Sequence, residues 1–314
     1  MNQKPRKIVV IGGGTGTYTV LSALKKYDVN LSAVVSMCDD GGSTGRLRDE
    51  YGVLPPGDIR RSLIALSSDD TYLRKLFEFR FAGGKFAGHN FGNLFLTALE
   101  KVSGNFHEAV KTAARILDVK GNVYPVTLDD IRLFAELESG EIISGETNID
   151  IPKHNPDLKI KKIFIKPMAK SNPDAVKAIL DADLIVIGPG DLYTSVLPNF
   201  LVSGISEAVL KSKARKVYIC NLMTKNGETN NFSVRDFVEE IQEYGKGLKL
   251  NYVFVNTKAP SSQRLLKYAK QKAELVSLSR NFRHPGLLTG NLITQGGLVR
   301  HDMKRLGAAI MKIC

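Results

Sequence analysis

The sequence predicts an α/β fold with a doubly wound, mostly parallel, Rossmann-like sheet and helices on both faces, in three αβα layers. The apolar residues 8–11 run directly into three glycines, and apolar residues at helical spacing follow. A second apolar strand covers 31–37, and the order of strand, glycine turn and helix returns from 183 onward. Two strands joined by one helix form a right-handed parallel unit, so a doubly wound sheet is the expected architecture.

The first glycine turn is a candidate anion-binding loop. The first N–H groups of a helix lack partners within it, the helix dipole adds positive potential, and glycines let the backbone approach a phosphate. The spacing approximates the dinucleotide fingerprint G-x-G-x-x-G, with Thr17 in the third position, and a role in packing alone is the alternative. The candidate ligand-binding residues here are Gly12, Gly13, Gly14, Thr15, Gly16 and Thr17.

A polar stretch, 38–61, follows the second strand and is interpreted as a loop that ends where Asp58 caps a helix. Open α/β sheets bind ligands at the carboxyl ends of their strands, so we expect ligand contacts here, with a flexible connection as the alternative. Paired carboxylates can hold Mg²⁺ and arginines can bind phosphate, which makes Asp39 and Asp40 candidate metal ligands. The candidate ligand-binding residues are Asp39, Asp40, Ser43, Thr44, Arg46, Gly57, Asp58 and Arg60.

The middle of the chain, about 68–167, is expected to be a helical segment plus a small β insertion within one domain that spans 1–314. Helical spacing of apolar residues predicts helices at 71–79, 91–102 and 106–117. The loop between the first two holds His89, Asn90 and Asn93, as ligand contacts or as structural residues. Three antiparallel strands are predicted from apolar alternation at 131–137, 142–145 and 161–165.

The parallel pattern resumes with a helix from 172 to 180 and a buried strand at 183–187. A second glycine turn follows, so the two glycine loops are expected to hold two ends of one ligand across a switch point. Further strands are predicted at 216–220 and 252–255, and helices at 233–243 and 261–271. Arg300 precedes a helix whose first turn holds Asp302, and it either pairs with that carboxylate or contacts a ligand phosphate. The candidates from this half are Gly188, Pro189, Gly190, Asp191, Tyr193, Thr194, Ser195, Asn221 and Arg300.

Composition excludes several classes of protein. The 314 residues are 43% hydrophobic and 24% charged, as in ordinary globular proteins, and the net charge is +12. The basic residues are scattered, without zinc-finger spacing or an aromatic RNP-like run, so we expect a solvated basic surface or attraction of phosphate ligands rather than nucleic-acid binding. The three separated cysteines predict neither disulfides nor zinc, and no apolar run approaches about 18 residues. A cytoplasmic protein without membrane insertion is expected, and a homo-oligomer is left open.

Four long motifs in this chain resemble a known family, the gluconeogenesis factor family (YvcK-like), whose members are relatives of 2-phospho-L-lactate transferase (CofD-like). They are GGGTGTY at 12–18, MCDDGGSTGRLRDEYGVLPPGDIRRSLIALS at 37–67, GHNFGNLFLTAL at 88–99 and GPGDLYTSVLPN at 188–199. The resemblance implies a nucleotide-type site at the strand ends. It also implies binding of UDP-sugars such as UDP-N-acetylglucosamine, and a role in regulating carbon metabolism and cell shape in bacteria.

Three hypotheses about function follow. The first is a nucleotide-sugar-binding regulator without turnover. The second is a Mg²⁺-dependent transferase acting on a nucleoside diphosphate donor, as in the transferase branch of the resemblance. The chain departs from that branch at Gly190-Asp191-Leu192 and in the stretch 55–60, which argues against its acceptor site. The third is an NAD(P)-binding oxidoreductase, which would need a proton donor such as His89.

Overall fold

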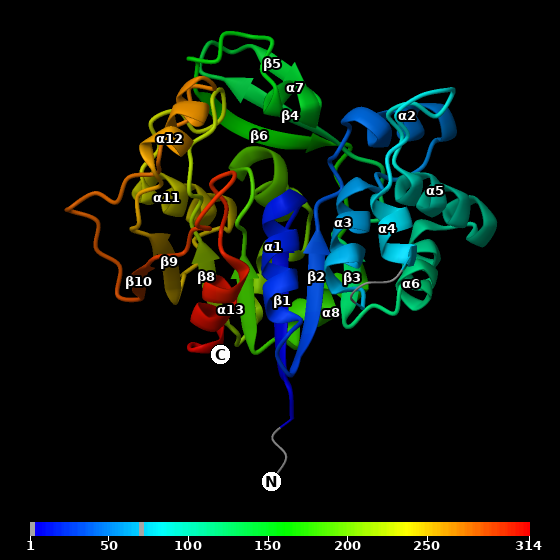
Figure 1. Ribbon diagram of the computed structural model, residues 1–314, viewed down its shortest axis with the longest axis horizontal. Coiled ribbons are helices and arrows are strands. Elements are labelled where there is room, and N and C mark those ends of the chain that lie inside the picture. The colour runs from blue at the N-terminus through cyan, green and yellow to red at the C-terminus, as the bar shows by residue number, and fades with distance from the viewer. Residues whose placement is uncertain (1–3, 69–71) are drawn as a thin grey trace.

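A seven-stranded parallel sheet forms the centre of the molecule in this computed structural model, which describes residues 4–68 and 72–314 (Figure 1). The strand order is β10-β9-β8-β7-β1-β2-β3. Helices α1, α3 and α13 pack together on one face, and α8 and α10 pack together on the other. The doubly wound α/β architecture predicted from the sequence is confirmed.

The elements alternate along most of the chain as a parallel sheet requires. The strands are β1 (Arg6–Gly12), β2 (Val29–Val35), β3 (Asn122–Pro125), β4 (Arg132–Leu137), β5 (Ile142–Ser144), β6 (Ile160–Lys166), β7 (Leu184–Ile187), β8 (Arg215–Ile219), β9 (Tyr252–Asn256) and β10 (Leu287–Gly290). The helices are α1 (Gly14–Leu24), α2 (Gly42–Tyr51), α3 (Gly57–Leu66), α4 (Tyr72–Glu78), α5 (Phe91–Ser103), α6 (Phe106–Ile116), α7 (Glu146–Asp150), α8 (Pro173–Leu180), the π-helical turn η1 (Leu192–Val196), α9 (Pro198–Leu201), α10 (Ile205–Lys211), α11 (Val234–Tyr244), α12 (Ser262–Ala269) and α13 (Met303–Met311).

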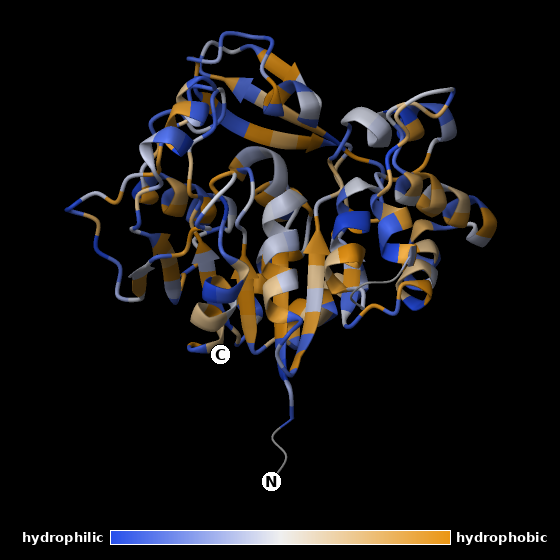
Figure 2. Ribbon diagram, in the orientation of Figure 1, coloured by the Kyte–Doolittle hydropathy of each residue, from blue (hydrophilic) through white to orange (hydrophobic). Residues whose placement is uncertain are grey.

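The core lies on both faces of the central strands. Every residue of β7 is buried, and so are the last five residues of β1, because helices cover the sheet on both sides. Figure 2 shows the central strands β1, β2 and β7 mainly in the orange of hydrophobic residues. Each fully buried Ile, Leu or Val side chain stabilises the fold by about 1.5–3 kcal/mol, which holds the strand ends in place for the loops that follow them.

The direction in which strands are added to the sheet reverses beside β1. This strand pairs with β2 on one side and with β7 on the other, both in parallel. The loops that follow β1 and β7 are therefore neighbours at the carboxyl edge of the sheet, which is where doubly wound folds bind ligands. The predicted switch point between the two glycine loops is confirmed.

The predicted antiparallel insertion is also present. Strands β4, β5 and β6 form a separate sheet in the order β5-β4-β6, and every pair is antiparallel. In Figure 1 this sheet and α7 lie above the carboxyl ends of the central strands. The insertion thus faces the switch point.

Several sequence predictions were wrong or incomplete. The stretch read as a polar loop contains the helix Gly42–Tyr51, and Asp58 lies inside the first turn of α3, whose N-cap is Pro56. The second glycine turn leads into three short helical pieces rather than one helix. Strands β3 and β10 were not predicted.

Two further differences concern helix ends. The predicted start of a helix at Thr71 lies outside the described residues, and the described helix α4 begins at Tyr72. Asp302 is the N-cap of α13 and accepts a hydrogen bond from the N–H of Arg305 at 2.9 Å, so it does not belong to the first turn. No helix among residues 4–68 and 72–314 is long and apolar enough to span a membrane.

Candidate functional site

A cavity of about 440 Å³ lies at the carboxyl edge of the sheet, between the switch point and the insertion. Both glycine loops, the loop after β2, α2, α3, α5 and α7 contribute to it. The lining residues are Gly13, Gly14, Thr15, Gly16, Asp39, Gly41, Gly42, Ser43, Thr44, Gly57, Asp58, Arg60, Arg61, Arg80, Asn93, Glu146, Thr147, Asp150, Ile151, Gly190, Asp191, Thr194 and Ser195.

The first glycine loop packs tightly against its surroundings. The N–H of Gly14, at the start of α1, donates to Asp58 Oδ2 at 2.8 Å, so a carboxylate of the chain already occupies one anion-binding position. A Cβ on Gly13 would lie 2.6 Å from that same oxygen. A Cβ on Gly16 would lie 1.9 Å from the carbonyl oxygen of Pro189, so glycine is required for the two loops to touch. The loop therefore serves both packing and the cavity.

The second glycine loop is held by side chains beneath it. The Nδ2 atom of Asn199 donates to Gly12 O at 3.3 Å and to Ser195 O at 3.0 Å, which ties the two loops together. The buried Glu228 accepts from the N–H of Tyr193 at 3.3 Å, at the start of η1. Asn221 donates to Gly190 O at 2.7 Å from outside the cavity lining. The loop is thus positioned before any ligand arrives.

Three carboxyl groups face the cavity with raised pKa values. Burial, and then the charge of Asp39, raise the pKa of Asp58 to about 6. Burial also raises the pKa of Asp39, against hydrogen bonds from Gly41 N at 3.0 Å and Thr44 Oγ1 at 2.9 Å. Burial, followed by the charges of Asp39 and Asp150, raises the pKa of Glu146 to about 9. Neighbouring like charges favour proton uptake by these carboxyl groups.

Three arginines line the cavity as well. Arg60 is buried and donates to Asn93 Oδ1 at 2.8 Å, and burial lowers its pKa to about 10. Arg61 pairs with Asp58 at 3.4 Å, and Arg80 donates to the carbonyl of Gly88. Guanidinium groups beside carboxylates let the cavity receive an anionic group and a cation together.

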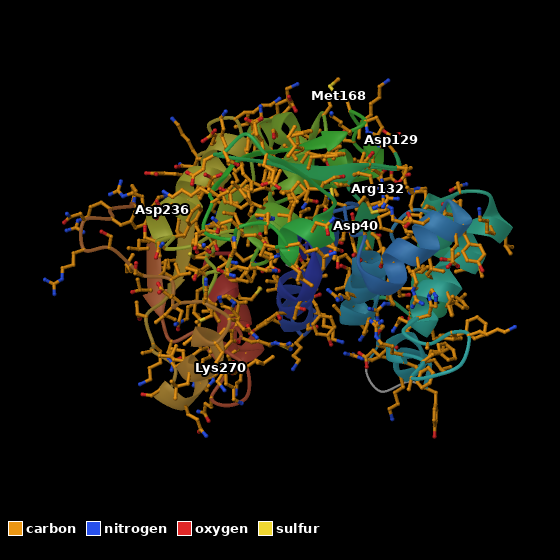
Figure 3. The ribbon with its side chains drawn as sticks, turned by 90° about the horizontal axis from the view of Figure 1, so that it is seen from above. Asp40, Asp129, Arg132, Met168, Asp236 and Lys270 are labelled. Carbon is orange, nitrogen blue, oxygen red and sulfur yellow. The ribbon has the colours of Figure 1, made fainter. Side chains whose placement is uncertain are left out.

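Asp40 has a structural role, because it holds the start of α7. Its carboxylate accepts from the N–H of Thr147 at 2.8 Å and of Glu146 at 3.1 Å, at the start of α7. In Figure 3, a view from above, the label of Asp40 lies next to that of Arg132, the first residue of β4 in the insertion. Asp40 does not line the cavity, so of the two predicted metal ligands only Asp39 is placed there.

Lys225 joins the insertion to the second glycine loop. Its ammonium group bonds to Asp150 of α7 and lies 2.9 Å from Asp191 and 3.4 Å from Glu228. Burial alone would lower the pKa of Lys225, but the charges of these three carboxylates outweigh it and raise the pKa. The carboxylate oxygens lie within 4.8 Å of one another, so the ammonium takes the place that a metal ion would fill.

The structure brings together about half of the predicted candidates. Those outside the lining are Gly12, Thr17, Asp40, Arg46, His89, Asn90, Gly188, Pro189, Tyr193, Asn221 and Arg300. His89 Nδ1 hydrogen-bonds Ser43 Oγ at 3.2 Å, while Asn90 caps α5. Burial, and then Arg46, lower the pKa of His89. Arg300 is exposed, and no ion pair with Asp302 forms among the described residues.

Sequence reasoning missed the contribution of the insertion. Glu146, Thr147, Asp150 and Ile151 line the cavity, yet they come from a segment that was predicted only as a small β insertion, without site residues. A signal was present, because Glu146 and Asp150 are four residues apart directly after a glycine and so share one face of a short helix. Arg61, Arg80, Gly41 and Gly42 were missed as well.

A second cavity of about 550 Å³ adjoins the first. Asp150, Ile151 and Asp191 line both, so the two cavities share a wall, and the ammonium of Lys225 bonds to Asp150 and Asp191 at this boundary. Its other lining residues are Pro152, Met223, Thr224, Lys225, Asn226, Tyr268, Gln271 and Ala273, which offer amide, hydroxyl and aromatic groups. Together the two cavities can hold an extended polar ligand.

The chain is similar to several bacterial proteins over nearly its whole length. It is 45% identical to the putative gluconeogenesis factor of Nostoc sp. over 98% of this chain and 68% of that protein. It is 42% identical to the putative gluconeogenesis factor of Thermotoga maritima over 98% of this chain and 99% of that protein. The protein named gluconeogenesis factor in Halalkalibacterium halodurans is 41% identical over 98% of this chain and 97% of that protein.

The fold matches a solved structure and the sequence matches a family model. The crystal structure of a member of the UPF0052 family from Bacillus halodurans superposes with a TM-score of 0.92 at 39% identity, covering 99% of this chain and 100% of that one. Residues 8–289 match the model of the family described as 2-phospho-L-lactate transferase CofD. The match includes most of β1, both glycine loops and the insertion, and the chain therefore belongs to the 2-phospho-L-lactate transferase CofD family.

Proposed function

We propose that this chain is a cytoplasmic nucleotide-sugar-binding regulator of central carbon metabolism, including gluconeogenesis, and of cell shape in bacteria. The observation that carries the proposal is the pair of adjoining cavities at the switch point. The first offers glycine loops and arginines suited to phosphate groups, and the second offers amide and hydroxyl groups suited to a base or a sugar. The names of relatives that are 41% and 45% identical to this chain support the metabolic role.

The ligand of this proposal is a UDP-sugar such as UDP-N-acetylglucosamine. In it, the diphosphate lies near Thr15, Gly16 and Arg61, since Asp58 already holds the N–H of Gly14. Diphosphate is anionic, and the cavity also carries several carboxylates, so binding requires that their charge be neutralised by protons or a cation. This requirement makes the metal dependence of binding the most informative variable.

The proposal includes a divalent cation held by carboxylates of the first cavity. Among the described residues, the acidic groups whose donor atoms lie within 4.8 Å of one another are Asp150, Asp191 and Glu228, and these already surround Lys225. Asp39, Asp58 and Glu146 are oxygen donors with raised pKa values on one cavity, and oxygen donors of this kind suit Mg²⁺. When bound there, Mg²⁺ would neutralise charge on a ligand phosphate. Asp39 remains a candidate ligand from the sequence, and Asp58 and Glu146 line the same cavity as Asp39, whereas Asp40 does not.

The same carboxylates favour a second candidate function, that of a Mg²⁺-dependent transferase on a nucleoside diphosphate donor. The family match supports this alternative. The third hypothesis, an NAD(P)-binding oxidoreductase, lacks support from the geometry, because His89 lies outside the cavity lining and bonds to Ser43.

Calorimetric titration tests the proposal. Purified protein is titrated with UDP-N-acetylglucosamine, GDP and NADP, each with and without Mg²⁺, and the UDP-sugar is recovered afterwards. Selective binding of an unchanged UDP-sugar is the expected result. Binding of GDP without the UDP-sugar would favour the transferase, and preference for NADP would favour the oxidoreductase.

A cellular experiment tests the role in metabolism and cell shape. A strain lacking the gene is complemented with the wild type or with a variant that no longer binds the UDP-sugar in calorimetry. We expect only the wild type to restore growth on gluconeogenic carbon sources and normal cell width. Full rescue by the non-binding variant would separate the cellular role from ligand binding.

A further inference from the structure

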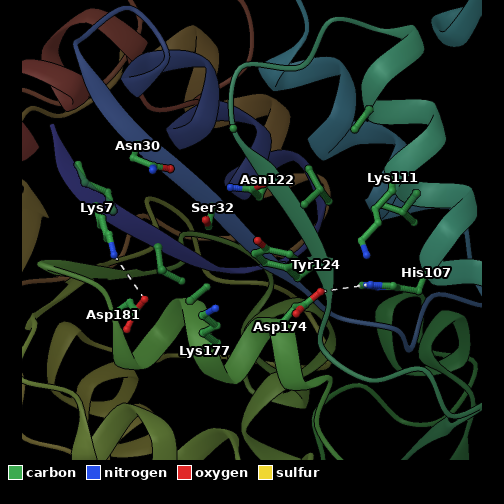
Figure 4. Close-up of a pocket in the computed structure, with 17 residues that line it drawn as sticks. Lys7, Asn30, Ser32, His107, Lys111, Asn122, Tyr124, Asp174, Lys177 and Asp181 are labelled. Carbon is green, nitrogen blue, oxygen red and sulfur yellow. Dashed lines mark hydrogen bonds and ion pairs between the residues drawn. The ribbon is translucent and has the colours of Figure 1, made fainter.

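A separate cavity of about 300 Å³ lies at the amino half of β1, β2 and β3, between α6 and α8 (Figure 4). It uses none of the residues of the carboxyl-edge site. The polar groups around it are Lys7, Asn30, Ser32, His107, Lys111, Asn122, Tyr124, Asp174, Lys177 and Asp181. We propose that this cavity is a second ligand site, for a small phosphorylated metabolite that carries hydroxyl groups.

The strand residues at the floor of the cavity include polar ones, unlike the apolar strands in the rest of the sheet. Asn30 and Ser32 alternate with Leu31 and Ala33, so the two polar residues share the face that looks into the cavity. Parallel strands covered on both faces are normally apolar throughout. Departures from such local rules concentrate at functional positions.

The strand register gathers these polar groups. Lys7 of β1 is aligned with Asn30 of β2, and Ser32 of β2 is aligned with Asn122 of β3. Among the described residues, the side chains of Asn30, Ser32 and Asn122 have no hydrogen-bond partner. Amide and hydroxyl groups both donate and accept, so this floor suits the hydroxyl groups of a ligand.

The walls carry a surplus of positive charge. The two aspartates are already paired, Asp181 with Lys7 at 3.4 Å and Asp174 with His107 at 3.2 Å, as the dashed lines in Figure 4 show. Lys177 of α8 makes no ion pair within the part of the chain that the structure describes. The ammonium group of Lys177 can therefore donate a charge-assisted hydrogen bond to a phosphate in the cavity.

The existing ion pairs leave the cavity adaptable. Lys7 with Asp181 and Lys111 with Glu108, the latter 3.3 Å apart, are exposed surface pairs of the kind that contribute about 0–1 kcal/mol. Either lysine can therefore leave its carboxylate and bind a ligand phosphate at little cost in free energy. The volume of about 300 Å³ is at the lower end of the range for ligand pockets, which favours a small molecule.

Methyl NMR locates binding directly. Val9 and Val110 line this cavity, whereas Ile151 lines the carboxyl-edge cavity, so their methyl signals report on the two sites separately. The protein is titrated with glycerol 3-phosphate up to millimolar concentration, and a second sample is titrated with inorganic phosphate over the same range. We expect saturable shifts at Val9 and Val110, a constant Ile151 signal, and tighter binding of glycerol 3-phosphate than of phosphate.

Matched variants complete the test. Lys177→Gln should weaken glycerol 3-phosphate binding by about tenfold, the effect of losing one charge-assisted hydrogen bond, while the exposed Lys249→Gln should leave it unchanged. Absence of saturable shifts at Val9 and Val110, or shifts that Lys177→Gln does not weaken, would overturn the site. Equal affinity for the two probes would overturn its preference for hydroxyl groups. Neither outcome bears on UDP-sugar binding at the other cavity.

Discussion

The carboxylate of Asp58 accepts a hydrogen bond from the backbone N–H of Gly14 at 2.8 Å, although the two residues lie on different helices. A helix N-terminus that sequence patterns assign to phosphate is thus occupied by a side chain of the protein itself. Phosphate binding in this cavity must then involve groups beyond the first glycine loop.

Asp58→Asn should separate charge from hydrogen bonding. The amide oxygen can still accept from Gly14, so we expect a small change in thermal stability. The part of UDP-sugar affinity that depends on Mg²⁺ should fall by about tenfold, since a carboxylate ligand is lost. Calorimetry with and without Mg²⁺ measures this, and an unchanged Mg²⁺ effect would exclude Asp58 as a metal ligand.

Gly16→Ala should destabilise the protein by about 3 kcal/mol, because the new Cβ would meet the carbonyl oxygen of Pro189 at 1.9 Å. Gly83→Ala is the control, since a Cβ there has nothing within 4 Å. Urea denaturation of both variants gives the free energies of unfolding. Equal stabilities would show that the two loops can separate without cost.

Asp40→Ala should loosen the insertion. Removing the acceptor for two N–H groups at the start of α7 costs about 1–2 kcal/mol, as for other helix caps. We expect faster limited proteolysis within 138–159 and weaker UDP-sugar binding, with Asp28→Ala, an exposed aspartate, as control. Weaker binding with unchanged proteolysis would point instead to a direct ligand contact by Asp40.

Glu146 should make both stability and metal binding depend on pH. Its pKa is about 9 in the folded protein against 4.5 ordinarily, so the folded state binds more protons between these values. Its contribution to the free energy of unfolding is therefore present below pH 4.5 and is lost as the pH rises to about 9. Mg²⁺ binding must displace this proton, so affinity should rise by up to about tenfold per pH unit from neutral pH until about pH 9.

Glu146→Gln should flatten both pH profiles, while Glu141→Gln, an exposed position on the same insertion, should leave them as in the wild type. Titrations with Mg²⁺ and denaturation curves over this pH range provide the two readouts. A Mg²⁺ affinity in Glu146→Gln that still rises with pH as steeply as in the wild type would assign the proton to another group.

Lys225→Ala should destabilise the protein by about 3 kcal/mol, because Asp150, Asp191 and Glu228 lose their shared cation. Their oxygens remain within 4.8 Å of one another, so Mn²⁺ should bind in the vacated position and restore part of the loss. Thermal denaturation with and without Mn²⁺ tests this, with Lys249→Ala as control. No Mn²⁺-dependent gain over the wild type would contradict the metal-like geometry.

The fold and the two glycine loops could be predicted from the sequence because hydrophobic periodicity and glycine turns are local signals. The helix Gly42–Tyr51 was missed because its polar residues give no apolar stripe, and the tertiary contacts of Arg48 and Asp39 hold it instead. Strand β3 has four residues and begins with Asn, so its strand signal is weak. The cavity wall from α7 depends on how the insertion folds back over the sheet, which no local pattern records.

The roles of individual candidates were harder to predict than their neighbourhood. Asp39 and Asp40 are adjacent in sequence, yet one faces the cavity and the other holds α7. Likewise, Asn90 caps α5, whereas Asn93 lines the cavity. Residue type indicates what a side chain can bind, but its direction depends on the backbone around it.

The amide of Asn199 has a consequence for selectivity. Because it bonds to both Gly12 and Ser195, the glycine loops form one rigid wall whose two halves keep a constant separation. The opposite wall, α7, is attached through the side chains of Asp40 and Lys225 and so can yield. For ligands that share a diphosphate and differ in their outer group, α7 would then determine which one binds. Relatives could change their ligand through substitutions in the insertion, with the two glycine loops unchanged.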